Sequence, residues 1–530
     1  MHSTHIPARF ARRAVALATV LVASTLSTAV MAQAFNPGNL IVSRTVYEGT
    51  ASTVTVGQAL PGGGTAIGNG DFANVFKNET PDPSFGVTSP IYIDQYSTAG
   101  NRVSTLAVNS NQITSSFASK SELALNVSTD GKSVSFMGYN APKNTLDVSN
   151  SNTTAVFDST NPVGSTYARS IGTINLSTGA VQVTNVNAYS GNNGRAVIQA
   201  NGQYYMVGNA GNGSGNGTTL SQLSDNTGVQ RIAVGNSGNT IAVGTPVGTF
   251  GSSTGYQRGF SLAQLPNLAN PTQNYAPDKT GKDDNFRGMT VFNNTLYVTK
   301  GSGSNGVDTV YQVGAKGALA NGGVIDNATI TVLPGFNKLS EKVAETTPTT
   351  AVPHPFGLQF LSDTVALVAD EGDGVRLGVA GKVTAFAGLQ LWKADSSGTW
   401  SLAQTFQQGL VGQVSTPNGL GWQVQEDGLR NITAQQNPDG TWTVYGTTST
   451  VSNELTHDLG ADPNEIVSIT IDPNTSTATN TAFSVMSTAS VGERFGGVAM
   501  APVPEPESYA LALVSLGLLG VFGRRKTRQG

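Results

Sequence analysis

The stretch from Ala196 to Val207 reads Ala-Val-Ile-Gln-Ala-Asn-Gly-Gln-Tyr-Tyr-Met-Val. Its first half holds small and β-branched residues, its second half holds two tyrosines, and Asn201-Gly202 separates the halves. Asn-Gly readily adopts the positive φ angles that a two-residue hairpin turn requires. The stretch therefore predicts two short antiparallel strands joined by a tight turn.

The same hairpin pattern recurs along the chain, which indicates an internal repeat. Each copy has a short first strand, a turn rich in Gly, Asn or Asp, and a second strand, and most copies have a third strand. The predicted first strands are Leu123–Val127, Ala196–Ala200, Arg231–Val234, Gly288–Phe292, Gly357–Phe360, Asn431–Thr433 and Gly496–Met500.

Four-stranded antiparallel units in series are typical of an all-β β-propeller. The N-terminal unit lacks a first strand, whereas Gly496–Met500 is a first strand with no unit after it. We therefore expect strands from both ends of the chain to close the ring. The repeat predicts seven blades, or six if residues 228–268 are an insertion. The alternative fold is a β-solenoid or a tandem sandwich, but a solenoid repeat would be shorter and more even.

Composition supports an exported β-rich protein. The chain has 63 glycines, 12% charged residues and no cysteine, so burial of a core must stabilise it without disulfides. Residues 35–502 hold 22 Lys and Arg against 31 Asp and Glu, a net charge of about −9. An acidic body argues against binding to nucleic acid, which needs a basic surface.

Each end of the chain predicts a removable or anchoring segment. In residues 1–34, three arginines precede an apolar run, and Ala32-Gln33-Ala34 fits a signal-peptidase site, so we expect a signal helix and export through the Sec machinery. In residues 503–530, an apolar run follows Pro504-Glu505-Pro506 and precedes Arg524, Arg525 and Lys526. This pattern predicts a short transmembrane helix with a cytoplasmic basic end, and a body, residues 35–502, on the far side.

The C-terminal segment resembles the PEP-CTERM sorting signal, which combines a Pro-Glu-Pro motif, a short hydrophobic helix and an Arg-rich cluster. The resemblance implies processing by an exosortase near Pro504-Glu505-Pro506, in a Gram-negative bacterium that makes exopolysaccharide. It implies a precursor anchored in the inner membrane, and then a product at the cell surface or outside the cell. The body is similar to the Gly-rich, propeller-like repeat bodies of several exported proteins that carry this tail.

An arginine stands at or just before five of the predicted first strands, and in a propeller these side chains would surround one mouth of the central channel. They would form an anion site suited to an acidic polysaccharide or another carboxylated ligand. The alternative is that each arginine pairs with a carboxylate of the next blade and only ties blades together. The five residues are Arg195, Arg231, Arg287, Arg430 and Arg494.

A second candidate site is the acidic turn formed by Asp370, Glu371 and Asp373, where clustered oxygens and glycines could hold calcium. Its spacing does not match an EF-hand loop, and a solvated turn is the alternative. Apart from calcium, the sequence predicts no cofactor. The body has only two histidines, His354 and His457, and no cysteine, which excludes a zinc cluster of these ligands.

No motif in the sequence names a reaction. We expect an exported module that binds exopolysaccharide or another ligand, or a passive component of a surface layer or biofilm. The alternative is an extracellular propeller enzyme, such as a polysaccharide lyase or a glycoside hydrolase. An enzyme would gather carboxylates of perturbed pKa, or a histidine, at one channel mouth.

Overall fold

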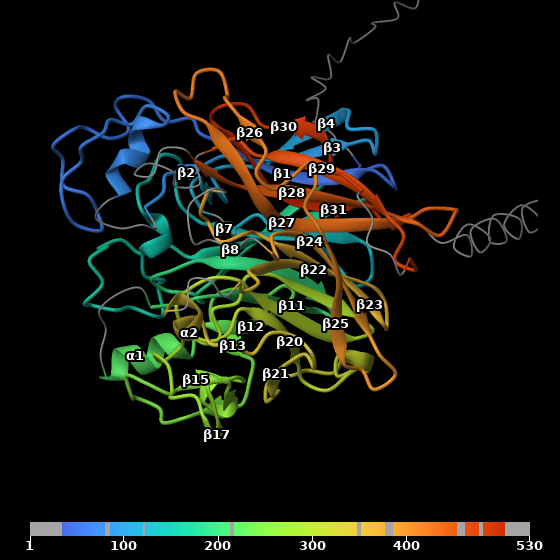
Figure 1. Ribbon diagram of the computed structural model, residues 1–530. Coiled ribbons are helices and arrows are strands. Elements are labelled where there is room, and N and C mark those ends of the chain that lie inside the picture. Colours follow the sequence, from blue (N-terminus) through green and yellow to red (C-terminus); the bar gives the residue numbers. More distant parts are fainter. Residues whose placement is uncertain are drawn as a thin grey trace, which may run out of the picture.

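Six antiparallel sheets form a propeller-like ring in the computed structural model (Figure 1). The structure describes residues 34–503, except 80–84, 120–121, 212–216, 347–350, 377–384, 453–461 and 476–480. The predicted signal helix and C-terminal helix lie outside the described residues. Within the part that is described, no helix is both long and apolar enough to cross a membrane.

Each blade is a sheet whose strands follow one another outward from the central channel. Blade 1 contains β31 (Glu493–Met500), β1 (Leu40–Val46), β3 (Ile91–Tyr96) and β4 (Arg102–Ala107). Blade 2 contains β6 (Asn126–Val127), β7 (Ser133–Tyr139), β8 (Arg169–Asn175) and β9 (Val181–Val186). Blade 3 contains β10 (Gly194–Ala200), β11 (Gln203–Gly208), β12 (Gly228–Ala233) and β13 (Ile241–Ala242).

The second half of the ring repeats this order. Blade 4 contains β18 (Met289–Phe292), β19 (Thr295–Lys300), β20 (Thr309–Val313) and β21 (Ile330–Val332). Blade 5 contains β22 (Pro355–Ser362), β23 (Val365–Asp370), β24 (Gly388–Ala394) and β25 (Trp400–Phe406). Blade 6 contains β27 (Val424–Gln436), β28 (Trp442–Ser452), β29 (Glu465–Ile471) and β30 (Ser484–Thr488), with the short β26 (Val414–Ser415) paired to the start of β27.

The two ends of the body meet in blade 1, as the sequence predicted. The C-terminal strand β31 is the innermost strand of that blade, and it pairs antiparallel with β1, from Leu40 opposite Met500 to Val46 opposite Glu493. Figure 1 shows the blue β1 beside the red β31. The ring is therefore closed by backbone hydrogen bonds between the first and the last strand of the body.

The expectation of seven blades is wrong, because Arg231–Val234 does not begin a blade. That segment falls largely within β12, the third strand of blade 3, which pairs with β11 from Gln203 opposite Ala233 to Gly208 opposite Gly228. Third strands and inner strands here are both short and apolar, so sequence pattern alone does not separate them. The six-blade alternative, with residues 228–268 outside the count, gives the right number, although β12 and β13 belong to blade 3.

Neighbouring blades share apolar packing all round the ring. Ile93 of blade 1 packs in one cluster with Phe136 of blade 2, and Met137 of blade 2 packs with Val197 of blade 3. A large cluster joins blades 3, 4 and 5, and further clusters join blade 5 to blade 6 and blade 6 to blade 1. Burial of this kind stabilises a chain that has no disulfides.

The remaining elements lie in the connections between strands. They include the two-stranded pairs β2 (Thr88–Ser89) with β5 (Ser115–Ser116), β14 (Pro246–Val247) with β15 (Gln257–Arg258), and β16 (Pro266–Asn267) with β17 (Asn270–Asn274). The helices are α1 (Gly217–Ser224), α2 (Glu341–Thr346), η1 (Asn74–Glu79), η2 (Val148–Asn150), η3 (Leu262–Gln264) and η4 (Ala320–Gly322). Helix α1, β15 and β17 lie together at one end of the molecule (Figure 1).

Ring closure gives a first prediction, which concerns the buried cation Arg44. Its Nε donates to Asp94 Oδ2 at 2.6 Å on one neighbouring strand, and its Nη1 donates to Glu493 Oε1 at 2.7 Å on the other. Because Asp94 is fully buried, we expect Arg44→Met to lower the free energy of unfolding by about 3 kcal/mol. Chemical denaturation of the full chain measures this loss.

The matched control is Lys143→Met, which removes an ion pair with Glu48 at the surface, where both side chains are more than a third exposed. Exposed pairs contribute at most about 1 kcal/mol. Equal losses for the two variants would contradict the view that Arg44 holds the closing strands together.

The arginine-lined mouth of the channel

Four of the five predicted arginines stand at the same end of the channel. Arg195 lies in β10, Arg430 in β27 and Arg494 in β31, and Arg287 comes two residues before β18. Residues near the ends of all six inner strands line a common cavity, so the starts of these strands lie toward the opposite end. We call the end where the four arginines stand the arginine mouth.

Register shifts in β10 and β27 determine the direction of the Arg195 and Arg430 side chains. In the β10–β11 ladder, Gly194 pairs with Gly208 and Ala196 with Val207, so Arg195 is left without an opposite residue. Arg430 is skipped in the same way between Leu429 and Asn431 of β27. A bulge of this kind interrupts the alternation of a strand and redirects the extra side chain.

Arg195 is buried among neutral oxygens rather than carboxylates. Its Nη1 donates to Asn285 Oδ1 and, at 3.2 Å, to the carbonyl oxygen of Phe286. Its Nε is buried and finds no hydrogen-bond partner among the described residues. A buried guanidinium with an unused donor retains capacity for one more acceptor.

The other three guanidiniums make different contacts. Arg430 Nε donates to Glu371 Oε2 at 3.1 Å, Arg287 Nη2 donates to Ser302 Oγ, and Arg494 Nη1 donates to the carbonyl oxygen of Ser119 at 2.5 Å. The Arg430–Glu371 pair joins blade 6 to the loop after β23, which is the architectural role that the sequence left open as the alternative.

The guanidinium groups of the arginine mouth repel one another. Burial, and then the positive charge of Arg287, hold the pKa of Arg195 well below its ordinary value, against the attraction of Glu122 and Glu371. Burial also lowers the pKa of Arg287, to which the charge of Arg430 adds. Since the protonated forms of these groups are destabilised by one another, a bound anion would stabilise all of them.

Glu122 lies at the blade 2 side of the same mouth. It accepts hydrogen bonds from the hydroxyl of Tyr139 and, at 3.0 Å, from the backbone N–H of Ser116. Burial raises the pKa of Glu122 to about 7, so much of its negative charge is lost at neutral pH. Glu122 and Arg494 both line a cavity of about 10 Å³, large enough for a single water molecule.

A second group of charges surrounds His354, which precedes β22. The Nδ1 atom of His354 lies 3.4 Å from Asp308 Oδ2, and Lys300 Nζ lies 2.6 Å from Asp308 Oδ1. The pKa of His354 is about 10, because Asp308 and Asp370 outweigh the effect of burial, so this side chain is cationic at neutral pH. Burial raises the pKa of Asp370 to about 6.

The acidic turn predicted to hold calcium is tied into this network. Asp370 accepts from the backbone N–H of His354 at 2.7 Å and from Gln390 Nε2 at 2.8 Å, and Glu371 faces Arg430. Asp373 accepts from the backbone N–H of Val375. Among described residues, no three acidic or histidine side chains gather as a metal site would require, and calcium binding stays a prediction.

Arg231 stands apart from the other four, because its strand is not an inner strand. It pairs with Asp326 through two hydrogen bonds, from Nε and Nη2, in the outer part of the ring. The predicted ring of five arginines is therefore a group of four. The residues of the predicted sorting site, Pro504, Glu505, Pro506, Arg524, Arg525 and Lys526, lie outside the described part of the chain.

Sequence reasoning missed the buried ionisable groups that surround the mouth. Arg169 is fully buried and donates to the carbonyl oxygens of Ser149, Ser151 and Asn192, and Lys300 is fully buried beside Asp308. The only sign of these groups in the sequence is a single basic residue within a strand of small residues. Such a residue does not reveal which distant group it pairs with.

One family model matches the chain, over residues 502–526, and it describes the PEP-CTERM protein-sorting motif. The predicted sorting signal is thereby confirmed, and it implies an exported protein that an exosortase sorts from a membrane-anchored precursor. No curated protein matches the chain.

Solved structures resemble the chain only distantly. A post-proline cleaving enzyme from Rickettsia typhi is 8% identical with a TM-score of 0.24, over 68% of this chain and 36% of that one. A mutant of the Synechocystis apocarotenoid oxygenase is 8% identical with a TM-score of 0.22, and the cobalt-substituted oxygenase is 9% identical with a TM-score of 0.22. Both comparisons cover 78% of this chain, and 59% and 60% of the oxygenase chains. This chain thus spans less than two thirds of the length of each of these proteins.

The buried carboxylates near the mouth give a second prediction. Burial raises the pKa of Asp284 to about 7. Burial also raises the pKa of its neighbour Asp283 to about 7, and the charge of Asp284 adds to that rise. The unfolded chain releases these protons near pH 4 and the folded chain near pH 7, so the free energy of unfolding falls as pH rises between these values. We expect the free energy of unfolding of Asp284→Asn to decrease by on the order of 2–3 kcal/mol less than that of the unmodified protein between pH 4.5 and pH 8. Chemical denaturation at the two pH values measures this difference.

Asp395→Asn is the control, because Asp395 lies on an exposed turn. An unchanged pH dependence in Asp284→Asn, equal to that of the control, would show that Asp284 is ionised in the folded protein at neutral pH.

Proposed function

We propose that this exported propeller is a binding module that takes a carboxylated ligand, such as the uronic acid units of an acidic polysaccharide, at its arginine mouth. The observation that carries the proposal is the buried guanidinium of Arg195, which has neutral oxygen partners and lies within range of the like charge of Arg287. A carboxylate fits the planar, forked donors of arginine better than a neutral group does.

Access and charge support the same proposal. Arg287, Glu371 and His354 are half-buried, so solvent reaches this mouth. The surrounding body is acidic, with 22 Lys and Arg against 31 Asp and Glu over residues 35–502. A local positive site in an acidic protein would capture anions selectively at the channel and not over the whole surface.

A second candidate function is an enzyme that cleaves an acidic polysaccharide. It is favoured by ionisable groups of raised pKa on two sides of the arginine mouth: Glu122 on the blade 2 side, and Asp370 with His354 on the blade 5 side. A carboxyl group with a pKa near 7 suits proton transfer at neutral pH. Binding stays the first candidate, because Glu122 and Asp370 are buried and already hydrogen-bonded to protein groups.

The test is binding of polygalacturonate to the full chain, with neutral dextran as the reference polymer. We expect Arg287→Ala combined with Arg430→Ala to weaken binding by about tenfold or more, since each charged hydrogen bond contributes roughly 1.5–3 kcal/mol. Binding should weaken as salt is added. Arg287→Lys retains the charge but loses the fork, and should give an intermediate affinity.

The matched control is Arg231→Ala, because Arg231 pairs with Asp326 away from the mouth. Thermal unfolding of each variant confirms that it is folded. Polygalacturonate binding that is unchanged in the double variant, or equal to dextran binding, would rule out the arginine mouth as the site. Shortened polygalacturonate after incubation, measured by size-exclusion chromatography, would put the enzyme first.

A further inference from the structure

The opposite end of the channel holds a second cavity of about 290 Å³, which has no part in the anion site. All six blades contribute to its wall through the later residues of their inner strands. Residues of one strand rise by roughly 3.3 Å each, so Thr290 lies on the order of 10 Å along the channel from Arg287. The two ends of the channel therefore present separate surfaces.

Among the described residues, none that lines this cavity has a charged side chain. The wall is made of Asn, Gln, Ser and Thr side chains together with aliphatic and aromatic groups. A charged ligand would lose its hydration here without meeting an opposite charge, which is costly. The cavity is thus unsuited to the anions that the arginine mouth would take.

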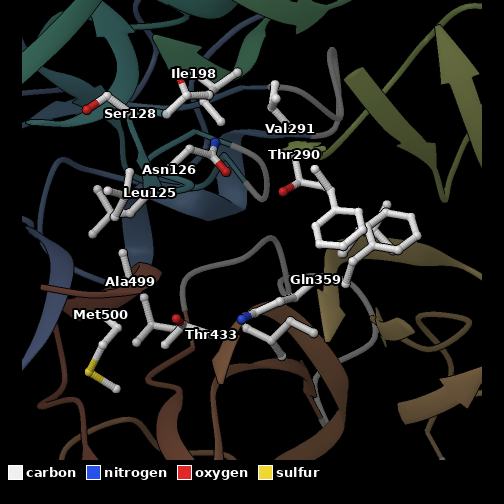
Figure 2. Close-up of a pocket in the computed structure, with 17 residues that line it drawn as sticks. Leu125, Asn126, Ser128, Ile198, Thr290, Val291, Gln359, Thr433, Ala499 and Met500 are labelled. Atoms are coloured by element: carbon white, nitrogen blue, oxygen red, sulfur yellow. The ribbon is translucent and has the colours of Figure 1, made fainter. Parts of the chain in front are cut away.

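Four polar side chains from four different blades surround the cavity. Figure 2 shows Asn126, Thr290, Gln359 and Thr433 around one open space, with Ile198 and Ala499 between them. Convergent polar groups on a partly apolar wall are typical of small-molecule sites, and about 300 Å³ is at the lower end of their size range. A cavity of this volume has room for a ligand of about one sugar ring.

These four side chains retain donors and acceptors that could hydrogen-bond a ligand. Asn126 Nδ2 donates to the carbonyl oxygen of Val197 at 3.0 Å, and Gln359 Nε2 donates to that of Ala434 at 3.3 Å. Each contact joins neighbouring blades and fixes the amide, while the amide oxygen and the second N–H keep their capacity. The hydroxyl groups of Thr290 and Thr433 bond to no other described residue.

We propose that this cavity binds an uncharged, hydroxyl-rich ligand, specifically a neutral monosaccharide unit. Amide and hydroxyl groups donate and accept, as sugar hydroxyls do, so the two sets match in kind. The apolar part of the wall, which includes Ile198 and the mutually stacked rings of Phe292 and Phe360, suits the C–H faces of a sugar ring. The site is independent of the proposed anion site.

The experiment is saturation-transfer difference NMR on the full chain with methyl glucoside, methyl galactoside, methyl rhamnoside and N-acetylglucosamine as probes. Sodium glucuronate is the charged comparison. We expect at least one neutral probe to bind. Thr290→Val combined with Gln359→Met should lower the affinity for that probe by about fivefold to tenfold, because two neutral hydrogen bonds are lost.

The matched control is Thr331→Val, which makes the same change at an exposed position of β21 in the same blade as Thr290. Thr290→Val alone keeps the side-chain shape, so it tests the site even if the double variant is unstable. Binding of no neutral probe, or binding that survives both pocket variants unchanged, would overturn the proposal. Arg287→Ala should leave neutral-sugar binding intact, which separates this result from failure of the anion site.

Discussion

The antiparallel pairing of β1 with β31 is the constraint on which the ring depends. Without it, blade 1 would lack its innermost strand, and the channel would be open on one side. The last residue of β31, Met500, lines the neutral cavity, and Ala501 donates its N–H to the carbonyl oxygen of Asn39. Both ends of the body therefore leave at the neutral end of the channel. The sorting motif, which begins at residue 502, is attached opposite the arginine mouth.

The two ends of the channel differ because charged residues such as Arg195, Arg287 and Arg494 stand near the starts of inner strands, whereas later residues of these strands are neutral where they line the cavity. At the first end, burial raises the pKa of Glu122 to about 7, lowers the pKa of Arg287 and holds that of Arg195 well below its ordinary value. Buried groups of this kind destabilise the folded state. The propeller stays folded because apolar packing joins every pair of neighbouring blades. Ionisable groups with shifted pKa values are concentrated at binding and catalytic sites.

Much of the fold follows from local sequence pattern. Hairpins such as Ala196–Val207 are predicted by their turn residues and alternation, and the unpaired strand Gly496–Met500 predicts ring closure. The blade count does not follow, because β12 has the small and β-branched residues of an inner strand and only its long-range pairing with β11 identifies it. The positions of Arg195, Arg287, Arg430 and Arg494 at one mouth follow from the repeat. Their electrostatics depend on partners that are distant in the sequence, such as Asn285, 90 residues from Arg195, and Glu371, 59 residues from Arg430. No spacing in the sequence reveals these partners.

A crystal structure of the protein with bound glucuronate would show whether the arginine mouth takes a carboxylate. We expect density for the ligand's carboxylate at the arginine mouth, within hydrogen-bonding distance of Arg195 and at least one of Arg287 and Arg430. An arginine mouth that stays empty while glucuronate occupies another site would contradict this expectation. In that case the four guanidiniums would be ties between blades, and the anion-binding role would have to be abandoned.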